Sequence, residues 1–292
     1  MALSPSGSVD PLLTARPATR SPEPLIDANP PASPSRRPAA VITGASAGFG
    51  VEFARRFAAR GHDVVLVARR REPMQRLADE LTAEHGVSAH VVPLDLTQAD
   101  AGDRLLAEVV ALDVDVRALV NNAGFGTYGA FAEADQARIA QEIALNVTAV
   151  TLLSRLFLPG LLAAGDGVLV NVASTAAYQP GPYLAVYAAT KAYVRSLTEA
   201  IWQETRGTGL KVLALAPGPT ETEFFEAAGS EKFKVGQMLS VPAVVDVAFR
   251  ALDRRDTPPS VVAGHRNKVT AVAAGLMPRR FTLAVAGRLT GE

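Results

Sequence analysis

From residue 39 onward, short apolar runs rich in Val, Leu and Ala alternate with longer segments of helical periodicity. The runs are short, and turn residues follow them, as is typical of buried parallel strands. Strands that alternate with helices indicate a sheet with crossover helices on both faces. We therefore predict an α/β fold, a Rossmann-like doubly wound parallel sheet of seven strands. The expected strands are Ala39–Thr43, Asp63–Ala68, Ser88–Pro93, Arg117–Asn121, Gly167–Asn171, Leu210–Ala216 and Ser260–Ala263.

The two ends of the chain depart from this pattern. Residues 1–38 are rich in Pro, Ser, Ala and Arg without a periodic apolar face, which predicts a disordered N-terminal extension. Residues 39–266 are expected to form one folded domain. Within it, residues 218–241 carry three phenylalanines and a methionine without a strong period, and we expect a mobile lid over an apolar pocket. Residues 267–292 predict an amphipathic tail that packs on its own domain, on a partner subunit or on a membrane surface.

The composition excludes several classes of function. Of the 292 residues 48% are hydrophobic, and 29 basic residues balance 29 acidic ones, so the chain lacks the basic excess of a nucleic-acid binder. It contains no cysteine, and its four histidines form no ligand-spaced cluster, which disfavours metal catalysis. The pair Leu12-Leu13 is too short for a signal-peptide core, and no run approaches about 18 apolar residues. A cytoplasmic location is expected.

A glycine-rich turn follows the first expected strand and precedes a helical segment. Its glycines are spaced G-x-x-x-G-x-G from Gly44 to Gly50. Such glycines let the backbone approach a pyrophosphate, and the helix N-terminus beyond them favours negative charge. We therefore predict nucleotide binding here, rather than a merely structural turn. The candidate contacts are Gly44, Ser46, Gly48, Phe49 and Gly50.

The end of the second strand indicates which nucleotide would bind. This strand ends in Arg69-Arg70-Arg71 and lacks the acidic residue that would accept a hydrogen bond from a ribose 2′-hydroxyl. A guanidinium at this place can pair with a 2′-phosphate. We therefore predict NADP(H), with Arg69 as the first candidate and Arg70 in support. The alternative is a solvated basic start to the next helix.

Tyr187 and Lys191 lie four residues apart in a segment of helical character, which places a phenol and an ammonium on one face. A cation beside a phenol favours the phenolate and can tune it for proton transfer. Ser174 follows the fifth strand, where its hydroxyl can hydrogen-bond a substrate carbonyl. We prefer this role for Ser174 to that of a helix cap, because the sequence of residues 174–178 is typical of a loop. Asn146 is an amide within an apolar helical run, which calls for a buried hydrogen-bond partner.

These residues resemble the short-chain dehydrogenase/reductase family from residue 39 to about residue 263. The resemblance implies the catalytic tetrad Asn146, Ser174, Tyr187 and Lys191, with the last two also contacting the cofactor. Asn121 begins the family's N-N-A-G motif, and we expect it to bond the backbone of the adjacent strand. The remaining cofactor contacts implied by the resemblance are Asp95, Leu96, Asn122, Ala123, Gly124, Pro217, Gly218, Thr220 and Thr222.

Together these features predict an NADP(H)-dependent oxidoreductase that interconverts a ketone or aldehyde and an alcohol. The lid's aromatic residues favour a lipophilic substrate, with Tyr128, Tyr178 and Tyr183 as pocket walls or packing residues. The resemblance also implies a homodimer or homotetramer. One alternative is a protein that binds NADP(H) and senses its redox state without turnover. A nucleotide-sugar epimerase shares the Tyr-x-x-x-Lys chemistry, but it needs a larger carboxyl-terminal domain and a differently spaced glycine loop.

Overall fold

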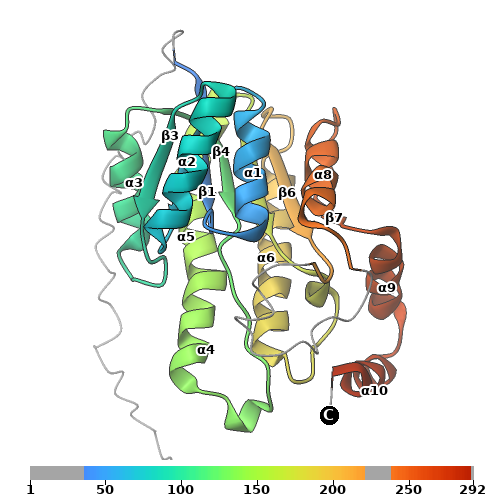
Figure 1. Cartoon of the computed structure of the whole chain (residues 1–292). Coiled ribbons are helices and arrows are strands. Elements are labelled where there is room, and N and C mark those ends of the chain that lie inside the picture. The colour runs from blue at the N-terminus through green and yellow to red at the C-terminus, as the bar shows by residue number, and fades with distance from the viewer. Residues whose placement is uncertain (1–35, 221–237, 291–292) are drawn as a thin grey trace, which may run out of the picture.

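The structure, a computed structural model, describes residues 36–220 and 238–290. Its centre is a seven-stranded sheet in the order β3-β2-β1-β4-β5-β6-β7, in which every neighbouring pair is parallel (Figure 1). This confirms the predicted fold class and the number of strands. The strands are β1 (Pro38–Thr43), β2 (Asp63–Ala68), β3 (Ala89–Pro93), β4 (Asp115–Asn121), β5 (Val168–Val172), β6 (Lys211–Ala216) and β7 (Ser260–Val262).

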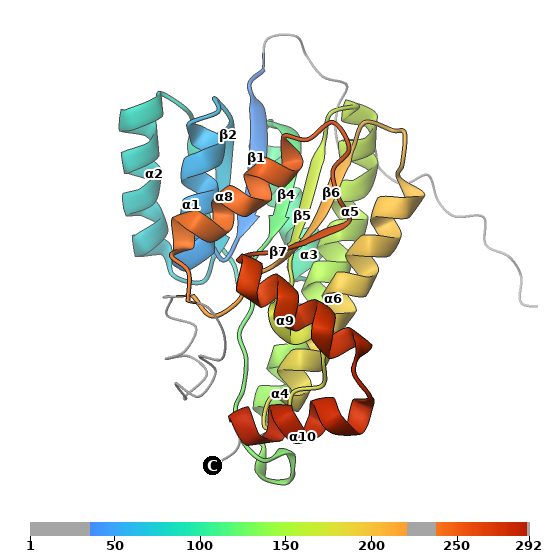
Figure 2. The same cartoon turned by 90° about the vertical axis from the view of Figure 1, so that its right-hand side faces the viewer.

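Helices cover both faces of the sheet (Figures 1 and 2). One face carries α1 (Gly48–Ala58), α2 (Arg71–His85) and α8 (Val241–Leu252), and the other carries α3 (Ala101–Ala111), α5 (Val150–Ala164) and α6 (Ala185–Glu204). The other helical elements are η2 (Phe131–Glu133), α4 (Gln136–Ile143), η3 (Ala144–Ala149), η4 (Thr175–Tyr178), α9 (His265–Leu276) and α10 (Arg279–Thr290).

Alternate residues of each strand pack into the two hydrophobic cores, one on each face of the sheet. Ile42 and Leu66 pack with α1, α2 and α8, whereas Val41 and Val65 point to the opposite face and pack with α3, α5 and α6. All four side chains are fully buried. Because successive strand residues face opposite sides, a sheet covered on both faces needs continuous apolar runs. Burying each such side chain contributes about 1.5–3 kcal/mol, which holds the strand ends in fixed positions.

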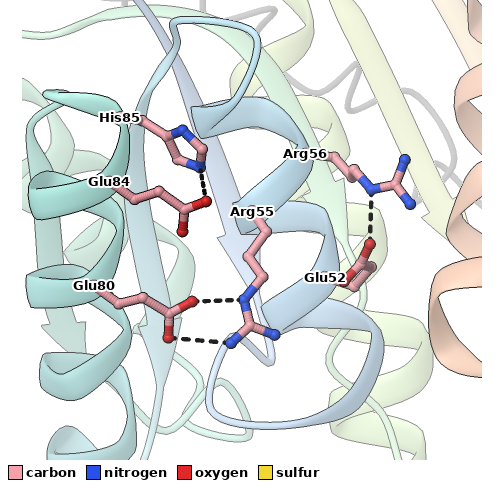
Figure 3. A network of polar contacts seen from close by, with 6 residues as sticks. All are labelled: Glu52, Arg55, Arg56, Glu80, Glu84 and His85. Atoms are coloured by element: carbon pink, nitrogen blue, oxygen red, sulfur yellow. Dashed lines mark hydrogen bonds and ion pairs between the residues drawn. The ribbon is translucent and has the colours of Figure 1, made fainter.

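Polar contacts join the helices of the first face at their surface. Figure 3 shows Arg55 of α1 making two hydrogen bonds, of 2.8 and 3.1 Å, to the carboxylate of Glu80 on α2. Arg56 contacts Glu52 at 2.7 Å on the same helix and also reaches Asp246 of α8. The Arg55 and Glu80 side chains are 45% and 42% exposed, so this pair contributes little compared with the cores.

The run Gln136–Ala164, which joins α4, η3 and α5, is long and apolar enough to cross a membrane by length and composition alone. In the structure, however, Leu153, Phe157 and Leu161 pack into the second core, as in a core helix. The middle of the run, η3, is a π-helical turn, which the sequence analysis did not anticipate. Turns of this kind often accompany functional sites, and this one carries Asn146.

The C-terminal tail forms two helices in the lower half of the molecule, and the first of them, α9, contacts η4 (Figure 2). Ala271, Ala274 and Ala286 are buried, so the tail packs on its own domain. Exposed apolar side chains remain on it, including Leu276 (83% exposed) and Phe281 (56%). The predicted N-terminal extension lies almost wholly outside the described residues, as does most of the predicted lid. Pro38, the last residue of the predicted extension, instead begins β1. Val241, the last residue of the predicted lid, begins α8.

Candidate functional site

A cavity of about 850 Å³ opens at the carboxyl ends of the strands. Segments that directly follow β1 to β6 line it, in agreement with the rule that ligands of open α/β sheets bind at this edge. Its volume lies within the usual range of small-molecule and cofactor sites. Among the residues that the structure describes, no cluster of three or more His, Cys, Asp or Glu side chains is arranged to hold a metal ion.

The glycine-rich turn forms one end of this cavity. Gly44 has a φ of 68° and donates its N–H to the carbonyl of Val67 at 2.8 Å. A Cβ on Gly44 would lie 2.7 Å from Nδ2 of Asn122, so only glycine fits. Helix α1 begins with Ala47 at its N-cap, and no side chain there accepts a hydrogen bond. Its first N–H groups are therefore available to an anion.

The predicted residues of this turn divide into two groups. Gly44, Ser46, Gly48 and Phe49 line the cavity, together with Ala47. Gly50 is buried behind them, where an added Cβ would collide with the carbonyl of Gly44. Gly50 thus packs the helix onto the loop and does not line the cavity itself.

Both candidate arginines at the end of β2 line the cavity. Arg70 also approaches the glycine-rich turn, with Nη2 3.3 Å from Oγ and 3.4 Å from the carbonyl oxygen of Ser46. Arg69 is exposed and borders the same space. Arg69 was the first candidate from the sequence, whereas the structure brings Arg70 to the turn.

The loops after β3, β4 and β6 supply the other predicted contacts. Asn122 donates Nδ2 to the carbonyl of Thr43 at 2.9 Å, and the Thr43 hydroxyl accepts from the N–H groups of Asn122 and Ala123 at 2.9 and 3.0 Å. These bonds fix the N-N-A-G segment against the glycine-rich turn. Thr222 lies outside the described residues. The cavity is lined by Asp95, Leu96, Asn122, Ala123, Gly124, Pro217, Gly218 and Thr220.

The predicted hydrogen-bond partner of Asn121 was wrong. Its side chain donates to Oδ1 of Asn171 at 2.9 Å and to Oγ of Ser154 at 3.1 Å, rather than to the neighbouring backbone. Asn171 in turn donates to Oγ1 of Thr198 at 3.0 Å. These four buried polar side chains connect β4, β5, α5 and α6 beneath the cavity. A buried hydrogen-bonded network of this kind fixes helices relative to the sheet, although Oδ1 of Asn121 has no hydrogen-bond partner among the described residues.

The tetrad residues converge beside this network. The Ser174 hydroxyl hydrogen-bonds the side chain of Tyr187, and Nζ of Lys191 donates to the carbonyl of Val172 at 2.8 Å. Nζ of Lys191 lies 5.9 Å from the centroid of the Tyr187 ring. Ser174 also accepts a hydrogen bond from the N–H of Ala176 at 3.1 Å and caps η4. The expected loop after Ser174 is therefore a short 3-10 helix, and Ser174 both caps it and contacts Tyr187.

Burial dominates the ionisation of this pair. It raises the pKa of Tyr187 to about 12, against the hydrogen bond from Ser174, which lowers it. Burial also lowers the pKa of Lys191 to about 8, while the nearby charge of Glu142 acts in the opposite direction. From the neighbouring cation alone, a lowered pKa was expected for Tyr187. Desolvation reverses that direction, so Tyr187 is a phenol at neutral pH.

Asn146 is fully buried and every polar atom of its side chain has a partner. Its Nδ2 donates to the carbonyl of Phe125 at 2.8 Å and to Oγ1 of Thr190 at 3.1 Å, and its Oδ1 accepts from the N–H of Phe125 at 3.2 Å. The Thr190 hydroxyl donates to the carbonyl of Tyr187 at 2.8 Å. Asn146 therefore ties the loop after β4 to the helix that carries Tyr187.

The remaining walls of the cavity were only partly foreseen. Tyr178 lines it, beneath the guanidinium of Arg195 at 4.2 Å, whereas Tyr128 and Tyr183 stack on each other at 6.1 Å and are not among the lining residues. The sequence analysis missed the contributions of α4 and of the tail. Apolar periodicity in residues 267–292 was a usable signal for helices but not for their position. The missed lining residues include Phe125, Arg138, Gln141, Leu145, Leu184, Asn267, Thr270, Ala271, Ala274 and Ala286.

Comparison with known proteins agrees with this geometry. The family profile described as short chain dehydrogenase matches residues 38–232. The chain belongs to the short-chain dehydrogenase family. It is accordingly an oxidoreductase acting on alcohol and carbonyl groups, in a family that binds NAD(H) or NADP(H).

Three relatives illustrate the range of this family. A sulfoacetaldehyde reductase of Chromohalobacter salexigens is 38% identical over 185 residues, which cover 63% of this chain and 72% of that protein. A short-chain dehydrogenase from Sphingobium yanoikuyae, solved in complex with NADPH, is 32% identical with a TM-score of 0.73 over 85% of this chain and 95% of that one. The bulky-bulky ketone specific alcohol dehydrogenase from Comamonas testosteroni is 31% identical, with a TM-score of 0.68 over 83% and 94% of the two chains.

The crowding around Gly44 predicts a selective loss of nucleotide binding in Gly44→Ala. The added methyl group would push Asn122 away from the turn, and we expect affinity for the nicotinamide nucleotide to fall roughly tenfold or more. Gly86→Ala is the matched control, because Gly86 also has a positive φ (62°) but nothing lies within 4 Å of its added Cβ. Fluorescence titration of both variants checks this, and equal affinities would contradict it.

Proposed function

We propose that this protein is an NADP(H)-dependent carbonyl reductase that uses Tyr187 as the general acid. The observation that carries the proposal is the meeting of Ser174, Tyr187 and Lys191 at a cavity that is also lined by a glycine-rich turn and by two arginines after β2. Asn146, Ser174, Tyr187 and Lys191 are the proposed catalytic residues.

The cavity suits a dinucleotide in its phosphate cradle. Gly44 leaves room where a side chain would collide, and the uncapped start of α1 presents N–H groups to the pyrophosphate. Arg69 and Arg70 would pair with a 2′-phosphate, because guanidinium groups bind phosphate in a bidentate manner. The lining residues Asp95, Leu96, Asn122, Ala123, Gly124, Pro217, Gly218 and Thr220 would contact the rest of the cofactor, together with Thr222 of the undescribed segment.

The chemistry follows from the hydroxyl groups at the carbonyl position. A bound nicotinamide cofactor supplies the hydride. The Ser174 hydroxyl donates a hydrogen bond to the substrate oxygen and polarises the carbonyl. Tyr187 then gives its proton to the oxygen as the alkoxide develops, and the ammonium of Lys191 stabilises the tyrosinate left behind. Asn146 holds the surrounding loop and helix in register.

The ionisation of Tyr187 favours reduction over oxidation. A phenol whose pKa is raised to about 12 carries its proton throughout the neutral range, so it is ready to act as an acid. Alcohol oxidation requires the phenolate, which burial disfavours. We therefore propose that Tyr187 is ready to act as the proton donor for carbonyl reduction at neutral pH.

The substrate is proposed to be lipophilic. Phe125, Leu145 and Leu184 line the cavity, and the small residues Ala271 and Ala274 of α9 leave space on the tail side. Arg138 and Gln141 add polar groups to the wall near Phe125, where the Arg138 guanidinium lies 3.9 Å from the ring centroid. A bulky ketone with an apolar body fits this lining better than a small polar one.

We further propose a cytoplasmic homodimer or homotetramer that pairs residues 136–162 and 183–206 with a second copy. Ile143, Leu152 and Tyr193 on these segments are 42%, 43% and 41% exposed, which supports an apolar contact surface. The tail supplies cavity wall in its own domain, and its exposed apolar side chains leave a weak membrane-surface contact as the secondary role of this segment.

Substrate size tests the lipophilic assignment. With NADPH as the reductant, we expect bulky aliphatic or polycyclic ketones to show higher kcat/KM than small polar carbonyl compounds, since only the former fill the apolar walls. Steady-state assays across a graded ketone series measure this. A preference for small polar carbonyls would refute the lipophilic pocket.

Arginine substitution tests the choice of cofactor. We expect Arg69→Ala and Arg70→Ala each to weaken NADPH binding by about 1–3 kcal/mol, the range of a charge-assisted hydrogen bond, while NADH affinity changes little. Fluorescence titrations of the original protein and of both variants, with NADPH and with NADH, measure these affinities. If both variants bind NADPH as tightly as the original protein, the 2′-phosphate is not held by these arginines.

Tyrosine substitution tests the catalytic role against a redox sensor that does not turn over substrate. Tyr187→Phe removes only the hydroxyl, and we expect ketone reduction to fall at least 100-fold while NADPH still binds. Tyr193→Phe is the matched control, because Tyr193 lies six residues further along the same helix and contacts Thr151 outside the cavity. Turnover that survives in Tyr187→Phe would remove Tyr187 from the mechanism, and no turnover of any carbonyl by the original protein would favour the sensor.

A further inference from the structure

Glu142 is a carboxyl group with no exposed surface, although buried carboxylates are rare unless they are paired. Oε2 accepts a hydrogen bond from the hydroxyl of Thr127 at 2.7 Å. Oε1 is buried and has no hydrogen-bond partner among the residues that the structure describes. A group of this kind is costly to bury, which raises the question of what it does.

Its place in the fold connects Glu142 with the tetrad. Glu142 precedes Asn146 by four residues in one helical run, so the two side chains project on the same side. A Cβ added to Gly124 would lie 2.9 Å from Oδ1 of Asn146 and 3.2 Å from Nζ of Lys191, so these two groups meet at Gly124. Thr127, three residues beyond Gly124, holds Glu142 against the same loop. Glu142 is therefore part of the buried wall behind Asn146 and Lys191.

The charged groups around this wall come from two helices. Lys191 and Tyr187 face Glu142 from α6, and Arg138 faces it from one turn earlier on α4. Burial raises the pKa of Glu142, whereas the Thr127 hydroxyl and the charges of Lys191 and Arg138 lower it. In return, the negative charge of Glu142 raises the pKa of both Tyr187 and Lys191.

Glu142 is not among the residues that line the cavity, so it would act through its neighbours and not on the substrate. We propose that Glu142 is a positioning residue whose buried carboxylate keeps Lys191 in its ammonium form and keeps the proton of Tyr187 in place. This inference rests on the proposed function, since it concerns the proton that Tyr187 donates. A negative charge beside two coupled acids makes every proton of the pair harder to remove.

Loss of the charge of Glu142 is expected to shift the pH profile of ketone reduction. Reduction needs Tyr187 with its proton, so the rate falls at high pH as the pair loses protons. Without the charge of Glu142, Tyr187 and Lys191 lose their protons at lower pH. We expect the alkaline limb of kcat/KM for ketone reduction to move down by roughly half a pH unit or more in Glu142→Gln. Glu142→Asp keeps the charge, and its limb should stay near that of the original protein.

The experiment compares pH profiles of the full-length chain and both variants with NADPH and one bulky ketone. NADPH affinity and melting temperature are measured alongside, because a merely structural role would change these and kcat without moving the limb. If Glu142→Gln does not fold, Glu142→Met replaces it. Methionine has a similar length and brings no unpaired oxygen, and apolar replacements of buried charges are often tolerated.

Each outcome decides the inference. A limb that moves to lower pH in the neutral variant and stays in place in Glu142→Asp supports it. A limb that is unchanged in the neutral variant, or that moves equally in both variants, overturns it. Absence of ketone reduction in the original protein would instead count against the proposed function.

Discussion

Removal of a phenol, an ammonium and a carboxyl group from water is the constraint on which the site depends. Tyr187, Lys191 and Glu142 are each less than a tenth exposed. Burial alone would neutralise them, by raising the pKa of Tyr187 and Glu142 and lowering that of Lys191. The carbonyl of Val172 and the mutual attraction of Lys191 and Glu142 offset part of this cost. With a pKa of about 8, Lys191 therefore keeps its charge at neutral pH.

The fold meets this constraint by fixing α6 against the sheet. Asn121, Ser154, Asn171 and Thr198 form a bonded polar layer between the sheet and its helices, one level below the cavity. Asn146 adds a second tie, between the loop after β4 and the start of α6. A π-helical turn at Asn146 is a local irregularity that is consistent with this demand. Positioning by rigid elements is what a precise proton donor requires.

The sheet could be predicted from the sequence because both of its faces are buried, and continuous apolar runs are the consequence of that burial. The glycine-rich turn was equally readable, since the collision at Gly44 leaves no other residue type. Side chains whose position depends on tertiary packing were not predictable. Glu142 stands in an ordinary helical sequence, and it is buried because α4 packs against the loop after β4 and against α6.

The position of the C-terminal tail was likewise not predictable from the sequence. Its amphipathic composition fitted its own domain, a partner subunit and a membrane surface equally well. The structure places Ala271, Ala274 and Ala286 on the cavity and leaves Leu276 exposed, a division that depends on where α9 meets η4. The direction of the tyrosine pKa shift was misjudged for a related reason, because sequence spacing reveals a neighbouring cation but not the loss of water.

The central claim is that this site transfers a hydride to a carbonyl carbon while Tyr187 protonates the oxygen. The most direct test uses NADPH that carries deuterium at both C4 positions, a bulky ketone, and analysis of the alcohol by mass spectrometry and NMR. The account predicts one deuterium per alcohol, located on the carbinol carbon. Alcohol without deuterium, or no alcohol from any ketone of the series, would contradict it.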